Sequence, residues 1–296
     1  RPAKSIIDGQ HLPPTHTEEN VRSTKDMIPR PSDIFVCTYP KCGTTWIQHI
    51  VLQLLGNTDY ERTNSTKAMC HESPMIESVG AGYCETIAEP RVLKTHFSYK
   101  DAPKGGGAKY IYSVRNPKDC LTSFFHHHRN FKHYMFEHGQ FNTFYELFMT
   151  GEVSYGDYFD HLIDWLDGMQ NGQENILLVK YEDMLVDLRS SIVKIAEFIG
   201  GKAAELIKDE EELTRIVEAS TLSAMKGNQQ RWFPKELQTG EFIRKGGSRD
   251  WKNHLSFEQN NRLDKRFNER LSSTVAADWW KEEMAWDVID SRSAYA

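Results

Sequence analysis

TYPKCGTTW, at Thr38 to Trp46, lies between a short apolar run and a longer periodic one. The run before it, DIFVCT at Asp33 to Thr38, has the β-branched and apolar residues of a strand. The run after it has apolar residues at the spacing of one helix face, namely Ile47, Ile50, Val51, Leu54 and Leu55. The stretch therefore predicts a strand, a tight loop and an amphipathic helix.

The loop itself has the composition of an anion site. Pro40 and Gly43 permit the turn, while Thr44 and Thr45 offer hydroxyls at the helix start, where unpaired amides carry partial positive charge. Lys41 adds a full positive charge, so we predict a P-loop-like phosphate site. The GxxxxGK[ST] pattern is not met, because the lysine precedes the glycine by two residues. A glycine-containing turn that binds nothing is the alternative on this stretch alone.

Composition sets bounds on the class of protein. At 296 residues, with 39% hydrophobic and 26% charged residues, the chain is long enough for a sizeable core. A net charge of −6 argues against a nucleic-acid or membrane-surface binder. Five cysteines without zinc spacing indicate a reduced compartment, and no apolar run approaches the roughly 20 residues of a membrane helix. We expect a cytoplasmic protein, although a chain that begins at Arg1 leaves a missing leader open.

The remaining pattern alternates strands with helices. Further strands are predicted at Arg91 to His96, Lys109 to Val114 and Asn175 to Val179, the last expected to be buried on both faces. Helices are predicted at Pro117 to Tyr134, Tyr155 to Met169, Leu185 to Ile199 and Glu210 to Ala219, with one more after a capping box at Ser256 and Gln259. The expected fold is α/β, a single domain with a parallel central sheet flanked by helices on both faces.

Some segments are predicted to lie outside this regular pattern. Residues 1–32 read as an N-terminal surface segment before a domain at 33–296. Asn57 to Pro90 is expected to be a variable excursion with a short helix, and Leu222 to Asp250 a long functional loop. The tryptophans Trp279, Trp280 and Trp286 are expected to dock the C-terminal segment onto the core.

Ligands of open α/β sheets bind beyond the carboxyl ends of the strands. Lys94-Thr95-His96 ends one predicted strand, Arg115 ends the next with Ser123 two helical turns later, and Tyr181 ends the last. Arg244-Lys245-Gly246 lies in the late loop. Since most of these places supply a cation or a titratable base, we predict that they converge on the Lys41 loop.

With these motifs in order, the chain resembles the cytosolic sulfotransferases, which use 3′-phosphoadenosine-5′-phosphosulfate (PAPS). TYPKCGTTW is similar to the 5′-phosphosulfate loop of that family, KTH to its catalytic-histidine strand, and VRNPKDCLTSFF to its 3′-phosphate strand and helix. RKGGSRDWKN is similar to its RKGxxGDWKN motif, and VSYGDYFDH and KYEDM match other family stretches. The resemblance covers about Asp33 to Arg270.

The resemblance implies a site and a reaction. It implies transfer of a sulfuryl group to a hydroxyl or amine of a small acceptor, with His96 as general base, Lys94 near the sulfonate oxygens, and no metal. It implies catalytic roles for His96, Lys41, Lys94 and Ser123, and donor binding by Lys41, Cys42, Gly43, Thr44, Thr45, Trp46, Arg115, Ser123, Tyr181, Ser220, Thr221, Leu222, Arg244, Lys245 and Gly246. Phe131 and Tyr134 are implied near the acceptor.

Elementary chemistry supports these roles. A neutral imidazole with a pKa near 6.5 can take the proton of an acceptor hydroxyl, and a lysine beside the leaving oxygen stabilises the charge that develops there. Two other readings stay open: a nucleotide kinase or related phosphoryl-transfer enzyme, and a catalytically silent nucleotide-binding protein. The acceptor is not identified, although the aromatic neighbourhood of Phe124 to Phe136 favours a flat apolar body.

Several positions depart from the family pattern. Cys42 replaces a serine, Leu222 an aromatic residue, and Arg249 a glycine that is usual in the late motif. The family's dimer motif is degraded at Lys252 to Asn261 (KNHLSFEQNN), so we predict a monomer or a weak homodimer. The run His126-His127-His128 is not expected to chelate a metal, because consecutive helical residues point about 100° apart.

Overall fold

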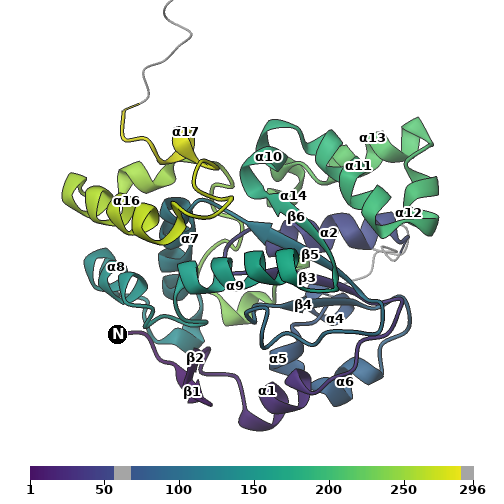
Figure 1. Cartoon of the computed structure of the whole chain (residues 1–296), viewed down its shortest axis with the longest axis horizontal. Coiled ribbons are helices and arrows are strands. Elements are labelled where there is room, and N and C mark those ends of the chain that lie inside the picture. Colours follow the sequence, from purple (N-terminus) through teal and green to yellow (C-terminus); the bar gives the residue numbers. More distant parts are fainter. Residues whose placement is uncertain (57–67, 288–296) are drawn as a thin grey trace, which may run out of the picture.

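A four-stranded parallel sheet forms the centre of the molecule (Figure 1). This computed structural model describes residues 1–56 and 68–287. The strands are β3 (Ile34–Thr38), β4 (Val92–Thr95), β5 (Lys109–Val114) and β6 (Asn175–Lys180), in the order β4-β3-β5-β6. Because all four run parallel, the loops that follow β3, β4 and β5 emerge at one edge of the sheet. The predicted parallel α/β sheet is confirmed.

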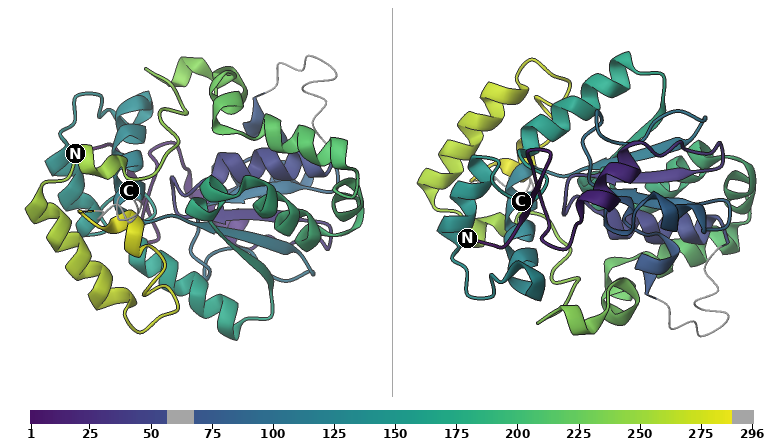
Figure 2. Two further views of the ribbon diagram at one scale, coloured as in Figure 1. Left: turned by 90° about the horizontal axis from the view of Figure 1, so that it is seen from above. Right: turned by 90° about the horizontal axis from the view of Figure 1, so that it is seen from below.

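Alternation along β3 distributes its side chains between two cores. Ile34 and Val36 pack with α2 (Thr44–Leu54), α11 (Leu188–Ile199) and α13 (Glu210–Ala219) on one face. Phe35 and Cys37 pack on the other face with the core that includes α7 (Pro117–Asn130) and α9 (Tyr158–Asn171). Figure 2 shows the helices on either side of the sheet. A strand buried on both faces explains the continuous apolar run that precedes the loop.

The other elements surround this centre. They are β1 (Ser5–Ile7), β2 (Gln10–Leu12), α1 (Glu18–Lys25), α4 (Met69–Glu72), α5 (Ile76–Val79), α6 (Ala81–Glu85), α8 (Phe141–Met149), α10 (Tyr181–Val186), α12 (Gly201–Leu206), α14 (Leu222–Lys226), α15 (Gln229–Trp232), α16 (Phe257–Leu271) and α17 (Lys281–Met284), with 3-10 turns η1 (Lys132–Tyr134), η2 (Lys235–Leu237) and η3 (Asp250–Asn253). The capping box of Ser256 and Gln259 at the start of α16 is confirmed. Of the predicted excursion at 57–90, residues 57–67 lie outside the described ranges.

The N-terminal segment, which was expected to lie on the surface, also packs into the larger core. β1 and β2 pair antiparallel, and α1 follows with Thr17 as its N-cap. Ile7, Leu12 and Val21 are almost fully buried and belong to the larger core. Residues 1–32 therefore contribute apolar contacts as well as covering the surface.

Two local predictions were wrong. β6 was expected to be buried on both faces, but it is an edge strand whose Ile176, Leu177 and Leu178 are only half-buried. β6 pairs with β5 alone. Its apolar side chains are therefore only partly covered on each face of the sheet. The helix predicted at 117–134 ends at Asn130 and continues as the separate turn η1.

The sheet's amino end is closed by a buried ion pair. Arg91 donates from Nε to Asp33 Oδ1 at 2.7 Å and from Nη2 to Oδ2 at 2.5 Å. Both side chains are fully buried. This two-point contact joins the starts of β3 and β4, at the end of the sheet away from the loops.

The C-terminal segment docks on the core as predicted. Trp280 is buried, and its indole N–H donates to Glu182 Oε2 at 2.8 Å. Trp279 and Trp286 are partly buried against the same core. Among the described residues, no helix is both long and apolar enough to cross a membrane.

Candidate active site

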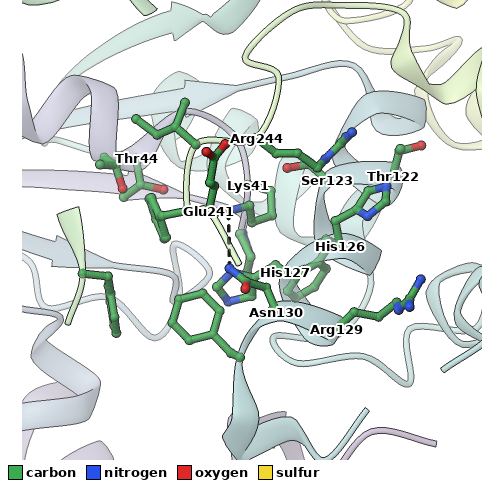
Figure 3. A pocket seen from close by; sticks show the side chains of 18 of the residues that line it. Lys41, Thr44, Thr122, Ser123, His126, His127, Arg129, Asn130, Glu241 and Arg244 are labelled. Atoms are coloured by element: carbon green, nitrogen blue, oxygen red, sulfur yellow. Dashed lines mark hydrogen bonds between the residues drawn. The ribbon is translucent and has the colours of Figure 1, made fainter. Parts of the chain in front are cut away.

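A cavity of about 780 Å³ opens at the carboxyl end of the sheet. Its wall comes from the loop after β3, the ends of β4 and β5, α7 and the segment 239–250 (Figure 3). The predicted residues that line it are Lys41, Gly43, Thr44, Thr45, Trp46, Lys94, His96, Arg115, Ser123, Phe131, Tyr134, Tyr181, Leu222, Arg244, Lys245 and Gly246. Side chains that are far apart in the sequence thus converge where the strand ends place them.

The loop after β3 requires its glycine. Gly43 has φ +91°, and a Cβ atom there would lie 3.0 Å from the ring of Tyr181. Lys41 also takes a left-handed conformation, with φ +73°. At the helix start, Thr44 Oγ1 lies 2.7 Å from Thr38 Oγ1, so the loop is tied to the strand that precedes it. The loop therefore wraps tightly around the amino end of α2, whose first amides have no helical acceptor.

Lys41 places a poorly solvated cation in the cavity. Burial, followed by the nearby charges of Arg115 and Lys94, lowers the pKa of its ammonium to about 8. Its Nζ lies 4.9 Å from the ring centroid of Phe242. Within residues 1–56 and 68–287, Lys41 makes no ion pair with a carboxylate. A cation held in this way favours an anionic ligand.

Arg115 joins three of the predicted segments. Its guanidinium donates to the carbonyl of Lys41 at 3.2 Å and to that of Gly247 at 2.9 Å. The same group lies over the ring of Tyr181, 4.3 Å from its centroid. The Tyr181 hydroxyl in turn donates to the carbonyl of Gly246 at 2.8 Å. The phosphate loop, the end of β5 and the late loop are thereby held together.

The late loop adds a second cationic group. Arg244 and Lys245 both contact the carboxylate of Asp250, Lys245 at 2.5 Å from Oδ1. Burial opposes ionisation of this carboxylate, but hydrogen bonds from Lys245 and Arg244 outweigh that effect and hold its pKa below the usual value. Asp250 thus pairs with both cations.

His96 has its tautomer set by its surroundings. Its Nδ1 lies 2.7 Å from the carbonyl oxygen of Thr38, which can only accept, so Nδ1 carries the proton. Nε2 then keeps its lone pair. Burial, and next the positive charge of Lys94, lower the pKa of His96 well below 6.5, so the ring is neutral near pH 7. The imidazole therefore has a nitrogen that can accept a proton near pH 7.

Two groups behind His96 were missed from the sequence. Glu77 is fully buried and accepts from the backbone N–H of His96 at 2.8 Å, and burial raises its pKa. The ring of Tyr155 contacts that of His96 edge-on, with centroids 5.1 Å apart. Glu77 lies in a stretch without clear periodicity, and nothing in its spacing indicated contact with the end of β4.

Three predicted donor residues lie outside the cavity wall. Cys42 is buried, and its Sγ lies 3.8 Å from that of Cys120. The carbonyl of Ser220 accepts from the indole N–H of Trp46 at 2.7 Å. Thr221 caps α14 by accepting from the N–H of Ala224. The side chains of Cys42 and Thr221 and the carbonyl of Ser220 thus have partners within the protein.

The departures noted in the sequence also have structural outcomes. Arg249 keeps the left-handed turn, with φ +68°, that a glycine would favour. Its side chain donates to the carbonyls of Glu282 and Ala285, so it holds the C-terminal segment and adds no cation to the cavity wall. Leu222 packs on Gly246, where an added Cβ would lie 2.9 Å from Leu222 Cδ1.

The chain was compared with known proteins. The family model described as "Sulfotransferase domain" matches residues 31–275. The chain belongs to the sulfotransferase family. This sulfotransferase is 32% identical over 283 residues to human sulfotransferase 1C2, covering 90% of this chain and 92% of that protein. It is 34% identical over 280 residues to the rabbit amine sulfotransferase, covering 90% and 87%.

A solved structure supports the same assignment. Mouse sulfotransferase SULT7A1, complexed with 3′-phosphoadenosine-5′-phosphate (PAP), superposes with a TM-score of 0.76 at 26% identity. The match covers 95% of this sulfotransferase and 98% of that chain. The resemblance inferred from the motifs is confirmed at the level of family and fold.

Proposed function

We propose that this sulfotransferase moves the sulfuryl group from PAPS to a hydroxyl or amine of a small, aromatic or apolar acceptor, with His96 as general base. The observation that carries the proposal is one cavity lined by a neutral imidazole, by Lys41 and Lys94 beside it, and by a further group of cations that comprises Arg115, Arg244 and Lys245. PAPS carries a 5′-phosphosulfate and a 3′-phosphate, and each of these anionic groups matches one of the two groups of cations. The PAP bound to the mouse relative supports this donor class.

The Lys41 end of the cavity fits the 5′-phosphosulfate. Lys41, Thr44 and Thr45 surround the start of α2, where amides and helix dipole favour an anion. During transfer the bond from sulfur to the bridging oxygen breaks, and negative charge grows on the 5′-phosphate. Lys41 stabilises that charge more in the transition state than in the ground state. Lys94 lines the same cavity, and we assign it the sulfonate oxygens.

The other end fits the 3′-phosphate. Arg115, Ser123, Arg244 and Lys245 line this part of the wall. Binding here requires the phosphate to replace the carboxylate of Asp250 at Arg244 and Lys245. Between the ends, Trp46 and Tyr181 pack edge-on with centroids 5.3 Å apart and offer aromatic surface to a purine.

The acceptor side is apolar with a few polar groups. Phe131 and Tyr134 line the cavity, and Phe233 packs edge-on against Phe131 with centroids 5.0 Å apart, so we assign this side to the acceptor. The acceptor hydroxyl would lose its proton to Nε2 of His96 as its oxygen bonds to sulfur. No metal has a part in this step. Cytoplasmic location and a monomeric or weakly dimeric state stay predictions.

Labelled sulfate transfer tests the proposal. Purified protein is incubated with sulfur-labelled PAPS and a panel of phenols, catecholamines, steroids, amines and aliphatic alcohols. We expect label in at least one acceptor. A parallel incubation with γ-labelled ATP and Mg²⁺ tests the kinase alternative, and transfer from ATP without transfer from PAPS would overturn the proposal.

Donor recognition can be tested separately. The two-ended site predicts that PAP binds at least about tenfold more tightly than adenosine 5′-monophosphate, because a phosphate buried against cations contributes more than 1.4 kcal/mol. Arg244→Ala should remove most of that difference and leave the affinity for the monophosphate nearly unchanged. Equal loss for both nucleotides would contradict the assignment of the 3′ end.

A further inference from the structure

Three metal-ligating side chains converge at the rim of the cavity. His126 comes from α7, while Asp250 and His254 lie four residues apart at the two ends of η3, which packs on α7. The two Nε2 atoms of His126 and His254 are 3.2 Å apart, and His254 Nε2 is 3.7 Å from Asp250 Oδ2. All three ligand atoms lie within 4.8 Å of one another. The site uses only one of the three consecutive histidines, so the argument against chelation by neighbours does not apply to it.

The spacing fits a tetrahedral ion. With Zn–N bonds of about 2.0–2.1 Å, two ligand nitrogens in tetrahedral geometry lie roughly 3.3 Å apart. The observed 3.2 Å agrees with that spacing. A hydrogen bond between the imidazoles would account for this contact alone, whereas Asp250, which Arg244 and Lys245 hold beside His254, supplies a third possible ligand. Asp250 Oδ2 is 3.7 Å from His254 Nε2, and a carboxylate oxygen lies within 4.8 Å of the His126 ligand atom, so Asp250 completes three ligands by moving closer to both rings.

Aromatic neighbours hold the two imidazole rings in place. The ring of His254 packs on Phe141, with centroids 5.4 Å apart, and that of His126 contacts Phe125 at 5.2 Å. Figure 3 shows His126 on the same helix as Ser123, close to Arg244.

We propose that His126, His254 and Asp250 bind Zn²⁺, with water in the fourth position, and that this ion strengthens nucleotide binding. The second part rests on the proposed function. Asp250 Oδ2 contacts Arg244, and Oδ1 contacts Lys245. An ion that takes Oδ2 releases Arg244 for the 3′-phosphate. The phosphate in turn offsets the repulsion between the ion and the two cations, so each ligand favours the other.

Zinc binding to the metal-free protein tests the site without any nucleotide. Titration calorimetry should give one Zn²⁺ per chain, and Co²⁺ should give the visible absorption of a tetrahedral centre. His254→Asn and His126→Asn should each lower the Zn²⁺ affinity by at least about tenfold. His71→Asn, at an exposed histidine on α4, is the matched control and should bind as the parent does. Thermal unfolding of each variant checks that the fold is retained.

These measurements test the Zn²⁺ site and its coupling to nucleotide binding separately. A parent that binds no Zn²⁺, or a His254→Asn variant that folds and binds as tightly, would overturn the site. PAP affinity should rise about fivefold or more when Zn²⁺ saturates the parent, and this gain should vanish in His254→Asn. PAP affinity independent of Zn²⁺ would overturn the coupling. Zinc binding without any PAP binding would leave the site intact and contradict the proposed function instead.

Discussion

At the scale of single residues, the site consists of groups whose protonation is set by burial. The carbonyl of Thr38 fixes the tautomer of His96, and desolvation keeps its ring neutral. The same desolvation makes Lys41 easier to deprotonate than a surface lysine. Burial thus keeps His96 neutral near pH 7, as the proposed general base must be, and limits the pH range in which Lys41 is charged.

The pKa shifts of His96 and Lys41 predict the pH dependence of kcat/KM for the donor. The value should not fall between pH 7.5 and 6.5, because His96 loses its proton well below pH 6.5. The value should decline above about pH 8, because Lys41 of the nucleotide-free enzyme then loses its proton. Lys41→Arg should lower the rate and remove the alkaline decline, since a guanidinium stays charged. A parent profile that is flat through pH 9 would contradict the assignment to Lys41.

At the scale of elements, the turn from β3 into α2 sets the position of the chemistry. Its residues could be recognised because they combine a strand pattern, a helix pattern and turn residues within a short stretch. The backbone conformation at Gly43 leaves no space for a side chain next to Tyr181. The loop and the end of β6 therefore constrain each other.

Gly43→Ala tests this constraint. A Cβ atom at φ +91° is strained and meets the Tyr181 ring at 3.0 Å, so we expect a loss of about 1–3 kcal/mol in the free energy of unfolding and weaker PAP binding. Gly9→Ala is the matched control, because it is also at positive φ but has no heavy atom within 4 Å of the added Cβ. The control should lose stability but keep its PAP affinity. Unchanged PAP affinity in Gly43→Ala would contradict the close fit.

The strands and helices could be predicted from the sequence more readily than their burial or their tertiary contacts. The order of strands and helices followed from periodicity, and the family motifs brought sixteen of the predicted site residues to one cavity. β6 was misjudged because an apolar edge strand has the same composition as a central one. Glu77 and the approach of His126 to His254 depend on tertiary packing between segments far apart in the sequence. No local spacing encodes such contacts.

At the scale of the whole molecule, a buried ion pair and the candidate site lie at opposite ends of the sheet. The Asp33–Arg91 pair closes the amino end, and the cavity occupies the carboxyl end. The C-terminal segment is anchored to α7 and α10, because Lys118 contacts the carbonyl of Met284 and Trp280 contacts Glu182. Changes at these supports should alter stability in different ways.

Asp33→Asn tests the amino end. The substitution removes the buried counter-charge of the Arg91 guanidinium and leaves it only the exposed carboxylate of Glu85, so the free energy of unfolding should fall by about 3–5 kcal/mol. Arg30→Ala is a matched control that removes exposed pairs with Glu85 and Glu89 and should cost about 1 kcal/mol or less. Denaturant unfolding measures both. PAP affinity of folded Asp33→Asn should equal that of the parent, and a large loss would contradict the separation of the two ends.

Trp280→Ala tests the docking of the C-terminal segment. Removing this buried indole should cost about 3–5 kcal/mol of unfolding free energy, because it leaves a cavity and an unpaired Glu182 oxygen. Trp279→Ala removes the partly buried neighbour and should cost clearly less. Equal losses in thermal or denaturant unfolding would show that Trp280 is not the anchor.

The most direct test of the account separates chemistry from binding at His96. Single-turnover transfer of labelled sulfate from PAPS is measured for the parent and for His96→Ala, alongside PAP affinity by calorimetry. The account predicts a rate lower by about 10²- to 10⁴-fold with PAP affinity within about twofold of the parent. A His96→Ala variant that transfers sulfate at the parent rate would contradict the central claim.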